Sequence, residues 1–230
     1  MVSLSPPGQD PDYHRFADQR GFLGIPNFLN VTSNIAFLLV GIAGVAFVAR
    51  RPPSHRAAWL TFWMGVSVIS VGSGYYHVNP DNRSLVWDRL PITLAFMGFL
   101  SAILGEYVSE RAGRTVLVPA VLAGLLSVLY WRWFDDLRFY YWIQLVPLLM
   151  VPAVMILYRA PYTRQRELLV AVGVYGLAKI SELYDSGIFE LTRHVLSGHT
   201  LKHLLAALSC LAVLAMLWRR RPIQGPFALS

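Results

Sequence analysis

The sequence predicts an all-α membrane protein, a bundle of seven transmembrane helices in one domain. Hydrophobic residues make up 55% of the 230 residues and charged residues only 14%, whereas a soluble domain carries about 25% charged residues. The mean hydropathy is +0.47. The apolar residues gather into runs close to the ~20 residues that a helix needs to cross a bilayer. The connections between these runs are too short to hold a second fold.

Hydropathy places the seven spans at residues 27–49, 56–78, 85–107, 114–131, 139–158, 166–184 and 198–218. Prolines cannot continue a helix, and they lie near the predicted boundaries at Pro26, Pro52, Pro53, Pro80, Pro161 and Pro222. The sixth span contains Lys179 and Glu182, which can neutralise each other along one helix face. We expect a structural ion pair there rather than a lipid headgroup site. A polar segment, residues 1–26, precedes the spans, and a tail, residues 219–230, follows them.

The net charge of +7 comes almost entirely from arginine. These arginines do not form one basic surface, as binding to nucleic acid would require, but lie in short clusters between the spans. One side of the membrane would hold Arg50, Arg51, Arg56, Arg111, Arg114, Arg159, Arg164, Arg166, Arg219, Arg220 and Arg221; the other would hold Arg15, Arg20, Arg83, Arg132, Arg138 and Arg193. Because positive charge concentrates in cytoplasmic loops, the C-terminus is predicted to be cytoplasmic and the N-terminus outside.

Five polar residues fall at one depth in this topology. Ser73 and His77 are four residues apart at the outer end of the second span, so they share a helix face. Asp88 lies in the first turns of the third span, and His199 and His203, again four apart, lie in the first turns of the seventh. Ionisable groups inside a bilayer are costly and usually functional, so this set is the candidate site.

The three histidines are a natural set of zinc ligands, because a catalytic zinc commonly keeps three protein ligands and leaves the fourth position to water. Asp88 is the predicted general acid and base, and Ser73 can hydrogen-bond the water or the developing oxyanion. A single histidine at a helix end is more often an interfacial residue than a ligand. That alternative fits the three remaining histidines, which lie outside the spans: His14, His55 and His194.

The order Ser-x-x-x-His, Asp, His-x-x-x-His on the second, third and seventh spans resembles the CREST superfamily of seven-span membrane hydrolases. Within it, the chain is most similar to the alkaline ceramidase (phytoceramidase) family. The stretch IPNFLNVTSNIAF also resembles the start of the first helix in that family. The resemblance extends over about residues 13–218.

The resemblance implies a zinc-dependent amidase that hydrolyses the N-acyl bond of ceramide-like lipids to a sphingoid base and a fatty acid. By this resemblance His77, His199 and His203 bind zinc, while Ser73 and Asp88 assist the attacking water. Few lysines and compact loops indicate a bacterial protein of the inner (plasma) membrane, with its site toward the non-cytoplasmic side. Many bacteria make no ceramide, so another N-acyl lipid is an alternative substrate.

The chain departs from the family at its calcium site. Animal ceramidases bind calcium through an acidic cluster before and at the start of the first span. Here Asp18 is present, but Asn27 stands where an acidic ligand is expected, and Arg15 and Arg20 make the stretch partly basic. These departures argue against calcium.

Two other classes remain open from the sequence. A seven-span lipid-sensing receptor with a structural zinc would share the fold and the motif, as the adiponectin and progestin receptors do. The short terminal segments favour an enzyme over a receptor, which would be expected to carry a sizeable soluble segment for its partner. A transporter is disfavoured because the chain shows neither a pair of broken helices nor an internal repeat.

Overall fold

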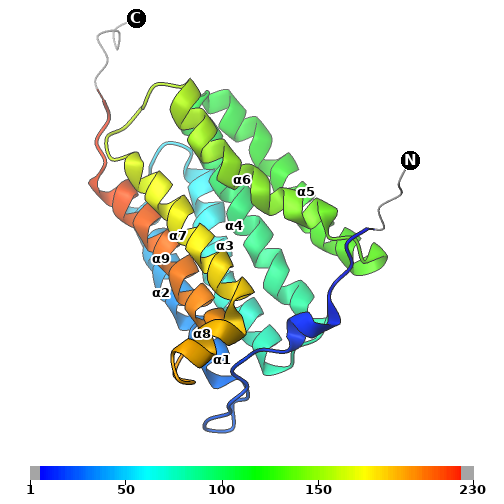
Figure 1. The fold of residues 1–230 in the computed structure, drawn as a ribbon. Helices are drawn as coiled ribbons and strands as arrows, with labels where there is room; N and C mark the ends of the chain where they lie inside the picture. The colour runs from blue at the N-terminus through cyan, green and yellow to red at the C-terminus, as the bar shows by residue number, and fades with distance from the viewer. Residues whose placement is uncertain (1–5, 224–230) are drawn as a thin grey trace, which may run out of the picture.

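The computed structural model describes residues 6–223, and this part of the chain is helical, with two isolated β-bridges and no strand. A 3₁₀ turn, η1 (Pro11–His14), precedes nine α-helices. The helices are α1 (Phe28–Thr32), α2 (Ile35–Arg50), α3 (Arg56–Val78), α4 (Ser84–Tyr107), α5 (Glu110–Phe134), α6 (Arg138–Leu157), α7 (Arg166–Leu183), α8 (Asp185–Leu191) and α9 (Gly198–Arg219). The long helices run side by side as an antiparallel bundle (Figure 1).

Each predicted span corresponds to helix in the structure. The first span is divided at Ser33 and Asn34 into α1 and α2, and the other six match α3 to α7 and α9 to within a few residues. Within residues 6–223, six helical segments are long and apolar enough to cross a membrane: Phe28–Arg50, α3, α4, α5, α6 and α9. α7 is not one of them, since its 18 residues include four that are charged. The protein is therefore an all-helical, multi-pass membrane protein.

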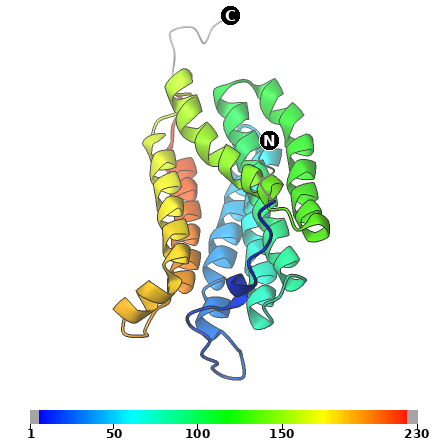
Figure 2. The same cartoon turned by 45° about the vertical axis from the view of Figure 1, so that its right-hand side comes forward.

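Two close helix contacts fix the geometry of the site. A Cβ atom at Gly72 of α3 would lie 2.0 Å from the backbone oxygen of Trp87 in α4. Pro91 removes the hydrogen bond that this oxygen would otherwise accept within α4. In the same way, a Cβ at Gly198 would lie 2.1 Å from the backbone oxygen of Ser181 in α7. Glycine at these positions lets α3 approach α4, and α9 approach α7, at the level of the predicted site residues; Figure 2 shows α7 and α9 side by side.

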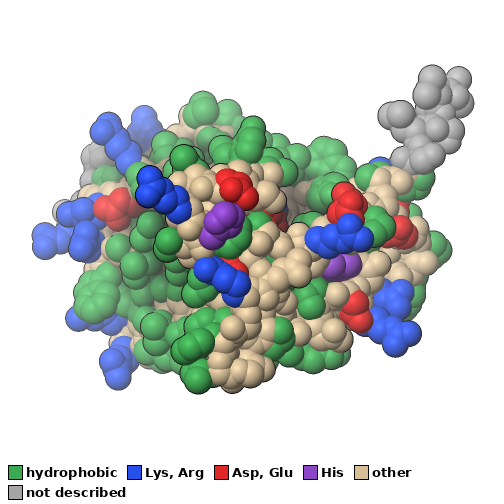
Figure 3. All heavy atoms as spheres, turned by 60° about the horizontal axis from the view of Figure 1, so that its bottom comes forward, with side chains coloured by type: hydrophobic (Ala, Val, Ile, Leu, Met, Phe, Trp, Pro, Cys, Tyr) green, Lys and Arg blue, Asp and Glu red, His purple; other side chains and the backbone are tan. Residues whose placement is uncertain are grey.

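Gly74, on the other side of Ser73, has open space where its Cβ would be, so of these two glycines only Gly72 is needed for close packing. The end of the bundle where α3 ends and α4 and α9 begin is called the histidine end below. Figure 3 looks onto this end, where basic and acidic side chains lie singly or in small groups among apolar and uncharged atoms.

Candidate metal centre

The three predicted histidine ligands meet in the interior of the histidine end. His77 lies in the last turn of α3, while His199 and His203 lie in the first two turns of α9. α9 begins here because Ser197 caps it: its side chain accepts a hydrogen bond from the backbone N–H of Thr200. All three imidazoles are buried, each with no more than 4% of its surface exposed.

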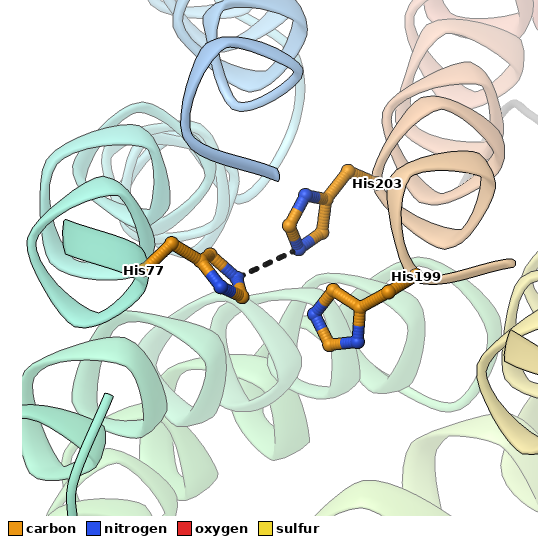
Figure 4. A group of neighbouring side chains, drawn as sticks. All are labelled: His77, His199 and His203. Carbon is orange, nitrogen blue, oxygen red and sulfur yellow. Dashed lines mark hydrogen bonds between the residues drawn. The ribbon is translucent and has the colours of Figure 1, made fainter. Parts of the chain in front are cut away.

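The geometry of the three rings fits a single metal ion. Figure 4 shows the imidazoles of His77, His199 and His203 turned toward a common point between α3 and α9. One candidate ligand atom from each residue lies within 4.8 Å of the other two, and Nε2 of His77 is 3.3 Å from Nε2 of His203. Two nitrogens bound to one tetrahedral zinc at 2.0–2.1 Å would be ~3.3 Å apart. The donor set and its spacing are therefore compatible with a metal ion.

Residues of the first span hold two of these histidines in place. Ser33 Oγ lies 2.8 Å from Nδ1 of His203, which leaves Nε2 to face the other rings. The side-chain amide of Asn27 donates a hydrogen bond of 2.8 Å to the backbone oxygen of His77. Ser33 is not among the residues that the sequence predicts for the site. The signal was the spacing of Asn27, Asn30 and Ser33, which puts polar groups on one face of an apolar segment.

The other two predicted site residues, Ser73 and Asp88, border the same cavity as His203. Ser73 lies one turn before His77 on α3, and Asp88 lies in the first turns of α4. Both are buried, with 2% and 8% of their surface exposed. The structure thus gathers all five predicted residues at one end of the bundle, as the shared depth predicted.

This cavity has a volume of about 720 Å³ and is polar at one end and apolar at the other. The polar end lies beside the histidines. Away from it the wall becomes apolar, with Phe62, Phe99, Ala206 and Val213 among the lining residues. The ten residues from His203 to Val213 correspond to ~15 Å along α9. The cavity is therefore large enough for a chain-like apolar ligand whose polar group lies near the histidines.

The N-terminal segment covers the histidine cluster, a role that its polar sequence did not predict. The ring of Phe16 lies 4.7 Å, centroid to centroid, from both His77 and His199. The segment is held by hydrogen bonds along its length: the backbone oxygen of Pro7 accepts from Leu137 N–H, and the backbone N–H of Ala17 donates to Asp185. In Figures 1 and 2 it runs from the α5–α6 turn across the bundle to α1.

The predicted pair of Lys179 and Glu182 is present in α7 and has a third member. Glu182 contacts Lys179 and also accepts from Lys202 of α9 at 2.8 Å. Lys202 Nζ is in addition 3.1 Å from Nε2 of His199. Lys202 could not be predicted from its own helix, because its carboxylate partner lies on α7. The available signal was a positive charge three residues after His199 and directly before His203.

The two candidate calcium residues have other partners. Both carboxylate oxygens of Asp18 accept hydrogen bonds of 2.8 Å from Arg20, and these bonds lower the pKa of the Asp18 carboxyl. The side-chain nitrogen of Asn27 points to the backbone of His77, as described above. An internal cation therefore neutralises Asp18.

The fold and the site together define a class: a multi-pass membrane protein with a buried three-histidine cluster beside a largely apolar cavity. Comparison with protein families shows to which family of this class the chain belongs. The family model described as Ceramidase matches residues 24–221, so the chain belongs to the ceramidase family. Membership implies a hydrolase acting on an amide bond, with a lipid such as ceramide as substrate. No curated protein sequence matches the chain significantly.

Proposed function

We propose that the protein is a zinc-dependent intramembrane amidohydrolase that cleaves the N-acyl amide of ceramide-like lipids to a sphingoid base and a fatty acid. The observation that carries the proposal is the buried cluster of His77, His199 and His203 at the polar end of a cavity that continues into the apolar bundle. Family membership supplies the amide bond as the target. The donor set favours zinc over the hard cations, which prefer oxygen ligands.

Each residue at the polar end has a part in the proposed reaction. Zinc, when held by the three imidazoles, supplies a Lewis acid that polarises the amide carbonyl and lowers the pKa of water. Asp88 accepts a proton from the attacking water and delivers it to the amine nitrogen as the C–N bond breaks. Ser73 donates a hydrogen bond to the carbonyl oxygen as negative charge develops there. The water oxygen ends in the fatty acid, and the proton ends on the amine.

The proposed topology has seven spans, with α7 as the sixth. α7 packs along α9, and its charged residues Lys179 and Glu182 pair with each other and with Lys202. Pairing reduces the cost of charge at membrane depth. By the distribution of arginine, the histidine end faces the non-cytoplasmic side of a bacterial inner membrane. The seven-span domain covers residues 27–218, between the polar segment 1–26 and the cytoplasmic tail 219–230.

The test has a metal arm and an activity arm. Purified protein is expected to carry about one zinc per chain by metal analysis, and His203→Ala is expected to lose it. His194→Ala is the matched control, because that histidine is exposed and outside the cluster. Full zinc occupancy in His203→Ala would show that the ligand assignment is wrong.

For activity, zinc-loaded protein is incubated with ceramides and other N-acyl lipids, and released fatty acid is detected by mass spectrometry. Asp88→Asn is expected to keep its metal and to lose turnover by about 10²–10⁴-fold, the usual contribution of a general acid–base. If the wild type releases no fatty acid from any of these lipids, the receptor alternative gains weight.

A further inference from the structure

Arg89 is a buried cation without a carboxylate partner. It follows Asp88 in α4, borders the cavity, and has 5% of its surface exposed. Among residues 6–223, no Asp or Glu oxygen lies within 4.0 Å of its guanidinium, although other arginines in the same part of the chain do form such pairs. Burying an unpaired charge costs several kcal/mol. Such a residue at membrane depth calls for a functional explanation.

Aromatic rings cover the faces of the Arg89 guanidinium, but not all of its N–H groups have a hydrogen-bond acceptor. The guanidinium carbon lies 3.9 Å from the ring centroid of Trp131 and 4.7 Å from that of Tyr140, so aromatic faces stabilise the charge. In the plane of the group, Nη2 donates to the side chain of Gln9 at 2.5 Å. Nη1 is buried and has no hydrogen-bond partner. Since guanidinium donors lie in the plane, aromatic contacts cannot replace the missing acceptor.

Lys202 adds a second positive charge to the same end of the cavity. It shares Glu182 with Lys179, so those three residues carry one net positive charge. If Asp88 is counted as ionised, the five charged side chains at this end still leave one positive charge without a counterpart. Asp10 and Asp12 also border the cavity, but both are exposed at its mouth, where water screens them.

The position of these cations relative to the reacting group follows from the polarity of the cavity. The apolar arm accepts the acyl chain, so the amine portion of the substrate lies at the polar end with Arg89 and Lys202. Lys202 Nζ is only 3.1 Å from Nε2 of His199, so a group that contacts it lies within a few bonds of the scissile amide. A neutral sphingoid base offers hydroxyl groups there, and these would leave the surplus charge uncompensated.

We propose that Arg89 and Lys202 form an anion-binding subsite for a carboxylate or phosphate on the amine portion of the substrate. This inference rests on the proposed amidase function and extends its substrate class from neutral ceramide-like lipids to acidic N-acyl lipids, such as N-acyl amino acids, which the site should prefer. A guanidinium presents donors in a planar fork that matches carboxylate and phosphate oxygens. The acidic group supplies the acceptor that Nη1 lacks, once the buried guanidinium turns Nη1 toward the cavity.

The test uses three lipids that share one acyl chain and one amide. They are N-dodecanoylglycine, N-dodecanoylethanolamine phosphate and the neutral N-dodecanoylethanolamine. We expect kcat/KM of the zinc-loaded protein to be at least about tenfold higher for one or both acidic lipids, since a charge-assisted hydrogen bond contributes about 1.5–3 kcal/mol. The carboxylate and phosphate arms identify the acidic group. Equal or higher kcat/KM for the neutral lipid would overturn the proposal.

Substitutions test whether the preference for acidic lipids comes from the subsite of Arg89 and Lys202. Arg89→Gln is expected to lower kcat/KM for the acidic lipid about tenfold more than for the neutral one, and Arg89→Lys to fall between. Arg83→Gln is the matched control, because Arg83 is exposed at the start of the same helix, and it should leave the preference unchanged. If Arg89→Gln does not fold, Lys202→Gln provides the second test. An unchanged preference in a folded Arg89→Gln protein contradicts the assignment.

A binding measurement separates this inference from the proposed function. The unfolding temperature of metal-free wild type should rise more with N-dodecanoylglycine or the phosphate lipid than with the neutral lipid, and Arg89→Gln should lose the difference. If the shift is seen without any hydrolysis, the subsite stands and the amidase proposal fails. If hydrolysis is seen and the neutral lipid stabilises equally well, the amidase stands and the subsite is wrong.

Discussion

Arg220 and Arg89 are both buried arginines at opposite ends of the bundle, but only Arg220 has a carboxylate partner. Arg220, just after α9, forms hydrogen bonds of 2.6 and 2.7 Å with the two carboxylate oxygens of Glu106 at the end of α4, and the pair is almost completely buried. Arg89 has aromatic neighbours and one amide, with no carboxylate. Complete pairing at one end indicates a structural clamp, whereas an unfilled donor at the other indicates a site that a ligand completes.

Truncating the two arginines should have the largest and most different effects on stability. Arg220→Met leaves Glu106 buried and unpaired, so we expect a loss of about 3–5 kcal/mol in the free energy of unfolding. Arg89→Met leaves no unpaired acid behind, so the loss should be smaller, about 1–2 kcal/mol from cation–π and packing contacts. Thermal unfolding in detergent measures both. Equal losses in the free energy of unfolding for the two variants would contradict the distinction between a structural ion pair at Arg220 and a ligand site at Arg89.

A double variant checks the cause of the larger effect. Glu106→Leu combined with Arg220→Met removes both charges, and it should recover most of the stability that Arg220→Met loses, since a buried pair and a matched apolar pair are often equivalent. Failure to recover would mean that packing around Trp59 and Tyr162, over which Arg220 lies, contributes more than the ion pair.

The next effect concerns the close contact at the histidine end. Gly198→Ala places a Cβ against the backbone oxygen of Ser181, so α9 must shift and we expect a loss of about 1–3 kcal/mol. Because the shift moves His199, zinc content should fall as well. The matched control is Gly176→Ala in α7, where the new Cβ meets nothing within 4 Å. That change should be neutral or slightly stabilising.

A smaller effect, confined to metal binding, is expected for Ser33→Ala. The change removes the hydrogen bond to Nδ1 of His203, and loss of such a partner typically weakens metal binding 10–100-fold. Competition with a chelator measures this affinity, and the unfolding temperature of the metal-free protein should change little. Ser70→Ala, which removes a serine bonded only to its own helix, is the control. Equal affinities for the two variants would contradict the supporting role of Ser33.

The smallest effect is the pH dependence contributed by Asp18. Its pKa is lowered by Arg20, so the ionised form is favoured in the folded protein. The stabilisation is present above the ordinary carboxyl pKa of about 3.9 and is lost as the pH falls through the lowered value. Because Arg20 is more than half exposed, we expect less than about 1 kcal/mol. Unfolding of the wild type and of Asp18→Asn between pH 7 and about pH 2 tests this.

In the same experiment, added calcium should leave the unfolding temperature of the wild type unchanged, since Arg20 already occupies both oxygens of Asp18. A rise with calcium that Asp18→Asn abolishes would restore the calcium site that the sequence departures argue against.

The sequence predicted the helices and the histidine cluster well because both depend on local patterns. Long apolar runs specify helices without reference to neighbours, and four-residue spacing places His199 and His203 on one face of α9. The predicted topology then placed His77, Ser73 and Asp88 at the same membrane depth as these two histidines.

Features that depend on which helices are neighbours could not be predicted in this way. Lys202 bonds to Glu182 only because α7 packs on α9, and Arg89 is isolated because its neighbours on α5 and α6 are aromatic. The segment around Phe16 has no periodic pattern, so nothing in it indicated a position over the histidine cluster. The division of the first span at Ser33 could not be predicted either, because it lies within a run that is otherwise apolar.

The position of Phe16 also has a practical consequence for handling the protein. Its ring lies against two of the three imidazoles, and the segment that carries it is fastened at both Leu137 and Asp185. An ion entering or leaving from that side must wait for the ring to move aside. Exchange of the proposed zinc should then be slow, so that the occupancy of a preparation would reflect its growth medium and purification history. Metal content should therefore be followed to a plateau before stoichiometries are compared.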